Sequence, residues 1–231
     1  MNHETFPVLP FNAILLVAVL FFATSAQAGP PLICHALDIG DAKSVPWTSH
    51  SWNLSGSESY ETKNLAADTM AILDSNPIVL VHMETIRRAT LYARQDPVAA
   101  KELLTKLVAR ANALGSKTKV GALASFDLGY LAESYKVWIG KDERNPAENV
   151  DGYELVSRAI QVRGKDPEME FAAALIALNG AAPEQQEHAR LAIDGAKDDP
   201  LLARNLSSRL NGPHTETMAE MILANSKIAR Q

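Results

Sequence analysis

The most constraining feature of this sequence is a set of apolar residues that recur every three or four positions from about residue 58 onward. An α-helix makes one turn in about 3.6 residues, so this spacing places the apolar side chains on one helical face. The stripes are Ala66, Met70 and Leu73; Val79, Met83, Ile86, Ala89 and Ala93; Leu104, Leu107, Ala111 and Leu114; Ala124, Leu128, Leu131, Tyr135 and Trp138; and Met218, Met221, Asn225 and Ile228. No run of alternating β-branched residues is long enough to predict a sheet. The sequence therefore predicts an all-α fold.

Signals for the starts of helices agree with these stripes. Asp96, Asp166 and Asp199 each precede a proline, which places a capping oxygen before a proline at the first helical position. Asp151 and Glu154 have the spacing of a capping box. These residues predict four helix N-termini.

Glycines predict where helices end. Gly115, Gly140, Gly164 and Gly180 follow apolar stripes, at the position where a left-handed backbone favours glycine. Together with the starts they predict about nine helices with short connections, so that neighbouring helices lie antiparallel.

One stretch has the anatomy of a helical repeat. Two helices, 167–179 and 183–197, are predicted between the starts at Asp166 and Asp199. Its small residues are Ala177, Ala189 and Ala196, and Ile193 is the large apolar residue between the last two. The stretch 167–200 resembles about one tetratricopeptide repeat. The resemblance implies antiparallel helical hairpins, stacked as a short solenoid or closed as a compact α-bundle, with a concave surface that holds another polypeptide.

The first 28 residues are typical of a secretory signal. An apolar run extends from Phe11 to Ala23, and Ala26-Gln27-Ala28 supplies small residues before Gly29. The run is shorter than the roughly 20 apolar residues that a membrane-spanning helix needs. We expect cleavage near Ala28-Gly29, export to the periplasm or extracellular space, and no transmembrane span in the mature chain. An uncleaved anchor is the alternative, because no Lys or Arg precedes the run.

Residues 29–57 differ in composition and periodicity from the rest of the mature chain. They are rich in proline, glycine and serine and show no helical period, which predicts an extended N-terminal arm ahead of a helical domain at 58–231. Trp47 and Trp52 lie in this arm. Because large aromatic side chains favour burial, we expect the arm to lie against the helices.

Composition excludes several classes of protein. The chain has a formal net charge of −5, which provides no basic footprint for nucleic acid. Its single cysteine rules out an internal disulfide, so the fold depends on core packing. We find no glycine-rich phosphate loop, nucleophile elbow or helical metal-binding pair, and we assign no cofactor.

One cluster of metal-ligand residue types lies in the arm. Cys34, His35 and His50 bring together a thiol and two imidazoles, which are ligands that zinc prefers. The alternative is that Cys34 packs as a small hydrophobic residue.

Aromatic residues provide a second candidate site. Trp47, Trp52, Tyr130 and Tyr153 would line a ligand groove, with core packing as the alternative.

Several charged and histidine residues are predicted to be solvent-exposed. His82 and His188 have no helical metal-binding partner, so each is assigned to a solvated helix face. The short run Arg87-Arg88 is assigned to an exposed face in the same way.

Two functional hypotheses follow. The first is an exported, noncatalytic helical protein that binds a protein or peptide, or acts as a scaffold, in the cell envelope. The second is a small-ligand or metal-binding protein, conceivably an enzyme, with a site at the Cys34/His35 arm.

Overall fold

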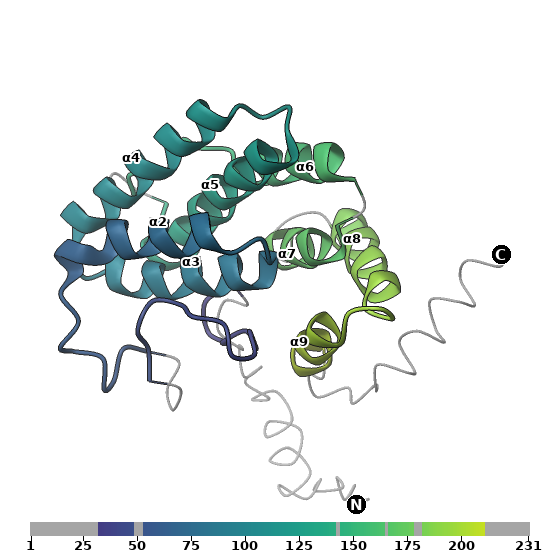
Figure 1. Ribbon diagram of the computed structural model, residues 1–231, viewed down its shortest axis with the longest axis horizontal. Helices are drawn as coiled ribbons and strands as arrows, with labels where there is room; N and C mark the ends of the chain where they lie inside the picture. Colours follow the sequence, from purple (N-terminus) through teal and green to yellow (C-terminus); the bar gives the residue numbers. More distant parts are fainter. Residues whose placement is uncertain (1–31, 49–52, 142–143, 165, 178–181, 211–231) are drawn as a thin grey trace, which may run out of the picture.

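A computed structural model describes residues 32–48, 53–141, 144–164, 166–177 and 182–210 of the chain. Within these ranges it contains α-helices, one short 3-10 helix and no strand (Figure 1). The elements are η2 (Thr62–Asn64), α2 (Leu65–Ser75), α3 (Val79–Ala93), α4 (Pro97–Leu114), α5 (Lys119–Trp138), α6 (Gly152–Arg163), α7 (Pro167–Ala177), α8 (Ala182–Gly195) and α9 (Pro200–Leu210). The predicted all-α fold is confirmed.

Two central helices organise the packing. Helix α3 packs against α2, α4, α5 and α7, and α5 packs against α3, α4, α6 and α7. Contact between α3 and α7 joins helices that are far apart in the chain, which makes this part of the molecule a bundle. Helices α7 and α8 pack closely as the hairpin predicted between Asp166 and Asp199, and α9 lies against both (Figure 1).

Helix α3 is buried far more completely than its apolar stripe predicts. Every residue of the helix except Arg88 is buried, although the sequence assigns only one face to the interior. Burial on all sides follows from the packing of four helices and the N-terminal arm around it.

Helix ends follow the predicted capping pattern. Asp96 accepts hydrogen bonds from the backbone N–H groups of Val98 and Ala99, and Asp151 accepts one from that of Glu154. The Asp166 and Asp199 side chains cap α7 and α9 in the same manner. The Glu154 side chain pairs with Arg158. Positive φ angles at Gly115 (66°) and Gly164 (69°) end α4 and α6, while Gly180 lies outside the described residues.

A pair of glycines sets the crossing of α5 and α6. A Cβ atom at Gly129 would lie 2.5 Å from the carbonyl oxygen of Gly152, and one at Gly152 would lie 2.4 Å from that of Gly129. The two backbones are therefore in direct contact, which only residues without a side chain permit.

Residues 32–48 form no helix and run along the bundle (Figure 1). Five apolar residues of this arm join the core: Leu32, Ile33, Leu37, Ile39 and Val45. The expectation that the arm lies against the helices is confirmed for this segment. The expected leader at 1–28, His50, Trp52 and the stripe from Met218 to Ile228 lie outside the described residues.

None of the described helices combines the length and the apolar character needed to span a membrane.

Candidate functional site

Two of the three predicted metal ligands, Cys34 and His35, lie at the surface of the arm. Cys34 is half-buried and its neighbour His35 is exposed, while His50 lies outside the described residues. In the part of the chain that the structure describes, no three His, Cys, Asp or Glu side chains are arranged to hold a metal ion.

The three aromatic residues of the predicted groove that the structure describes, Trp47, Tyr130 and Tyr153, lie in different surroundings. Tyr130 is 1% exposed and stacks on Phe126 in the core, as the packing alternative predicts. Trp47 is half-buried, and its indole Nε1 donates to the carbonyl oxygen of Asn53 at 2.7 Å. Tyr153 lies in the first turn of α6, against α8.

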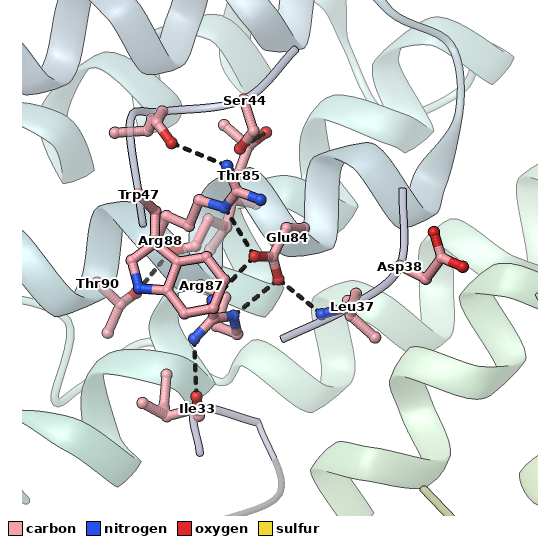
Figure 2. Close-up of polar contacts among 12 residues, drawn as sticks. Ile33, Leu37, Asp38, Ser44, Trp47, Glu84, Thr85, Arg87, Arg88 and Thr90 are labelled. Atoms are coloured by element: carbon pink, nitrogen blue, oxygen red, sulfur yellow. Dashed lines mark hydrogen bonds and ion pairs between the residues drawn. The ribbon is translucent and has the colours of Figure 1, made fainter. Parts of the chain in front are cut away.

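A buried ion pair on α3 replaces the solvated charges that the sequence predicts. Glu84 and Arg87 are both fully buried, and the guanidinium of Arg87 donates to both carboxylate oxygens of Glu84 at 2.7 and 2.8 Å (Figure 2). Arg88 donates to the same carboxylate at 2.7 Å. The prediction of an exposed Arg87-Arg88 run is wrong, because the arm covers this face of α3.

The same cluster binds the backbone of the arm. Figure 2 shows Glu84 accepting from the N–H of Leu37 at 2.9 Å and Arg87 donating to the carbonyl of Ile33 at 3.0 Å. Arg88 donates to the carbonyl of Val45 at 3.1 Å. Buried charges are tolerated when each is paired and hydrogen-bonded, and the arm supplies the remaining partners.

Helix α9 holds the middle of the arm. The Asn205 amide accepts from the N–H of Asp38 and donates to the carbonyl of the same residue, each at 2.8 Å. Arg204 pairs with the Asp38 carboxylate at 2.7 Å. Its hydrogen bond, together with one from the N–H of Gly40, lowers the pKa of Asp38. The arm is therefore fixed to α3 and to α9 through its main chain.

A buried imidazole lies where the sequence predicts a solvated one. His82 is fully buried on α3, with Nδ1 2.7 Å from the Asp127 carboxylate and Nε2 2.6 Å from the carbonyl oxygen of Asn76. Both partners are acceptors, so both ring nitrogens must carry protons to make these bonds. Burial lowers the pKa of His82, but the charge and hydrogen bond of Asp127 outweigh it and raise the pKa overall.

Asp127 extends this cluster to two further helices. Its second oxygen accepts from Arg110 of α4 at 2.6 Å, and Arg110 also pairs with Asp74 of α2 at 2.7 Å. The cluster therefore joins α2, α3, α4 and α5. Its His82 and Asp127 side chains are fully buried, while the Asp74 carboxylate at its edge is exposed.

A second imidazole joins α6, α7 and α8. His188 Nδ1 lies 2.6 Å from the Glu170 carboxylate, and Nε2 lies 2.8 Å from the hydroxyl of Tyr153. The His188 side chain is 17% exposed, so the assignment to a solvated face is wrong. Burial raises the pKa of Tyr153, which disfavours the phenolate that a nucleophilic role would require.

An acidic side chain lies where the N-termini of α3, α7 and α9 meet. Glu168 accepts from the N–H of Leu80 at 3.0 Å and lies beside Asp166 and Asp199, at the edge of a cavity of about 450 Å³. Burial, with smaller contributions from these two carboxylates, raises the pKa of Glu168 to about 7.

An open groove of about 630 Å³ lies between α4 and α6, with α5 as its floor. Its main lining residues are Ala111 and Asn112 on α4, Ala122, Ser125 and Leu128 on α5, and Leu155, Ala159 and Val162 on α6, with the loop from Gly115 to Lys117 at one end. Val162 is 38% exposed and Ala111 and Leu155 are half-buried, whereas the floor residues Ala122, Ser125 and Leu128 are buried. Apolar surface is thus accessible along the rim of the groove.

Sequence reasoning missed this groove. Ala111 and Leu114 were expected on the buried stripe of α4, but Ala111 is only half-buried and Leu114 is exposed. The last turns of α4 extend past the elements that cover its first half. A signal was present in the chain, since residues 103–126 contain four basic side chains and no carboxylate.

Comparisons with protein-family models, curated proteins and solved structures find no match to this chain.

Proposed function

We propose that this chain is an exported, noncatalytic helical module that binds a polypeptide, or scaffolds one, in the cell envelope. The observation that carries the proposal is the open groove between α4 and α6. Exposed apolar surface in a concave site is typical of protein interaction surfaces.

The shape of the groove supports a helical partner. Small side chains line it on three helices, namely Ala111, Ala122 and Ala159. Helices pack at axial separations of about 8–10 Å, and small contact residues favour the lower end of that range. A fourth helix would place its apolar face on the rim of the groove, at Ala111, Leu155 and Val162, in the helix-in-groove mode of recognition.

The polar clusters support a noncatalytic role. Glu84 and Arg87 fasten the arm, and His82 and Asp127 join four helices. These groups already have partners within the fold, so none of them is poised to act on a substrate.

The export part of the proposal rests on the leader-like residues 1–28. Intact-mass analysis of the protein recovered from its native source tests it. We expect a chain that begins at Gly29, and an unprocessed chain beginning at Met1 in a cytosolic fraction would overturn it.

Site-specific photo-crosslinking tests the binding role. A photoreactive amino acid at Ala111 or Val162 would face the groove, whereas the same amino acid at Val98, which is 78% exposed on the first turn of α4, would not. We expect both groove positions to form an adduct with the same polypeptide in envelope extract, and Val98 to form none. Identical adducts from all three positions, or none from the groove, would contradict a binding role for this surface.

A small-ligand or metal site at the arm is the second candidate. The observation that favours it is that the adjacent Cys34 and His35 both remain accessible on the arm. Metal analysis of the purified protein, of Cys34→Ala and of His35→Ala tests it. Stoichiometric metal that both substitutions abolish would support this candidate, and metal-free wild-type protein would remove it.

A further inference from the structure

The charged side chains that line the groove are both basic, although the whole chain has a net charge of −5. Residues 103–126, from α4 into α5, contain Lys106, Arg110, Lys117 and Lys119 and no carboxylate. Residues 155–163 of α6 likewise contain basic side chains and no carboxylate. The residues that line the groove include Lys117 and Arg158 and no Asp or Glu.

Ion pairs within the fold do not remove the positive charge of the side chains that line the groove. Arg110 is neutralised by Asp74 and Asp127, and it does not line the groove. Arg158 pairs with Glu154, but the two side chains are 67% and 54% exposed. Exposed pairs of this kind contribute little to stability, so Arg158 can exchange its partner at little cost.

The positions of the charges match the shape of the groove. Lys117 lies in the loop at one end and Arg158 lies on the α6 wall, while the floor between them is formed by Ala122, Ser125 and Leu128. The Ser125 hydroxyl donates to the carbonyl of Gly121, so the floor has little unsatisfied polarity. The floor residues are themselves buried, so the accessible apolar surface lies on the rim, at Ala111, Leu155 and Val162. A ligand must therefore combine an apolar face toward this rim with negative charge toward the loop and α6.

We infer that the partner segment is an acidic amphipathic helix, with an apolar stripe that lies on the rim of the groove and carboxylates that pair with Lys117 and Arg158. The inference rests on the proposed function and specifies its partner. Charge complementarity of this kind determines which partner is accepted and how fast it associates.

Nucleic acid fits these features less well. Its affinity comes from many phosphate contacts, whereas the groove offers two cations above an apolar floor in an acidic protein. A polyanion without an apolar face would leave the rim of the groove uncovered.

Two synthetic peptides test the inference on the full chain. Both carry leucines at helical positions i, i+3, i+4 and i+7 and so on, and their remaining positions are mainly glutamate in one and mainly lysine in the other. Fluorescence anisotropy with a labelled peptide measures each dissociation constant. We expect the glutamate peptide to bind about tenfold more tightly, with the preference shrinking as salt shortens the Debye length.

Charge-reversal variants locate the effect. Lys117→Glu combined with Arg158→Glu should remove the preference or reverse it. Lys101→Glu is the matched control, because Lys101 is exposed on α4 and does not line the groove. The control should bind both peptides as the wild type does, and circular dichroism should show the same helix content in all three proteins.

The outcomes separate this inference from the proposed function. Equal binding of both peptides, or a preference that survives the double substitution, overturns the acidic partner while groove adducts in the crosslinking experiment still support a binding role. Competition by single-stranded DNA as strong as that by the glutamate peptide also overturns it, because the site would then respond to charge alone. Absence of groove adducts removes the proposed function itself.

Discussion

The pairs His82–Asp127 and His188–Glu170 join an imidazole to a carboxylate with nearly the same geometry but in different surroundings. His82 and Asp127 are both fully buried, and the second nitrogen of His82 faces a backbone carbonyl. His188 and Glu170 have side chains that are 17% and 7% exposed, and the second nitrogen of His188 faces the hydroxyl of Tyr153. The contact distance alone therefore does not determine how much an ion pair contributes to the stability of the fold.

The difference lies in what each second partner permits. A carbonyl only accepts, so His82 keeps both bonds only as the imidazolium, and its charge must be balanced by Asp127 in the interior. A hydroxyl can donate or accept, so the Tyr153 contact persists in either protonation state of His188. The first pair is a rigid requirement of the fold, and the second is an adaptable link between helices.

The largest expected effect comes from removing the carboxylate of each pair. Asp127→Ala leaves His82 without its counter-charge in the interior and leaves Arg110 with Asp74 alone, and we expect it to lower the free energy of unfolding by about 3–5 kcal/mol. Glu170→Ala should cost about 1–2 kcal/mol, because water can reach His188. Urea denaturation at pH 6 measures the free energy of unfolding of both variants. Equal losses would show that the two pairs contribute equally to stability.

The next effect concerns the charge on His82. His82→Gln should cost about 2–3 kcal/mol at pH 6, where it removes two hydrogen bonds from a charged donor. The folded pKa of His82 is raised above its ordinary value of 6.5, so the stability from its charge is complete below pH 6.5 and is lost as the pH rises through the folded pKa. The penalty of the substitution should therefore shrink in alkaline urea titrations, and a penalty that grows with pH would show that the buried ring is neutral.

The pH dependence of stability that Glu168 causes must be distinguished from that of His82. Both side chains act at the N-terminal end of α3, and both contributions to stability fall as the pH rises. Its pKa is raised from 4.5 to about 7, so its contribution to stability is greatest below pH 4.5 and falls as the pH rises through 7. Glu168→Gln should stabilise the protein by about 2 kcal/mol at pH 8 and have little effect at pH 4, since an amide still accepts from Leu80. Thermal unfolding at the two pH values checks this, and equal shifts at both would remove Glu168 from the pH dependence.

The smallest effect should come from the adaptable link. Tyr153→Phe removes one hydroxyl from a half-buried contact and should cost about 0.5–1 kcal/mol, with the same helix content by circular dichroism. A loss of stability as large as that of Asp127→Ala would show that the His188 cluster contributes as much to stability as the buried His82 cluster.

Local chemistry explains which features could be predicted from the sequence. The caps at Asp96 and Asp151 satisfy backbone groups two or three residues away, so nearby residues are enough to place them. The burial of His82, Glu84 and Arg87 could not be predicted in this way. Polar side chains on a helix indicate a solvated face unless partners are known, and here those partners come from the arm and from α5.

The features of the candidate site likewise separate into those that the sequence shows and those that only the folded structure shows. The basic composition of residues 103–126 is visible in the chain, but the groove exists only because α4 and α6 both pack on α5. The cavity boundary depends on where α4 extends past its neighbours, as the exposure of Leu114 demonstrates. No periodic pattern contains that information.

By itself the sequence determined the helical class, most helix ends and the absence of an internal disulfide, because these depend on composition and on interactions within one or two turns. Tertiary structure alone decided which charges are buried, where the arm lies and where the groove opens. Asp38 and Asn205 are 167 positions apart, and only the folded chain brings their polar groups within hydrogen-bond distance. Burial of a charge is tolerated when such distant partners compensate its lost hydration, and that compensation is a property of the whole fold.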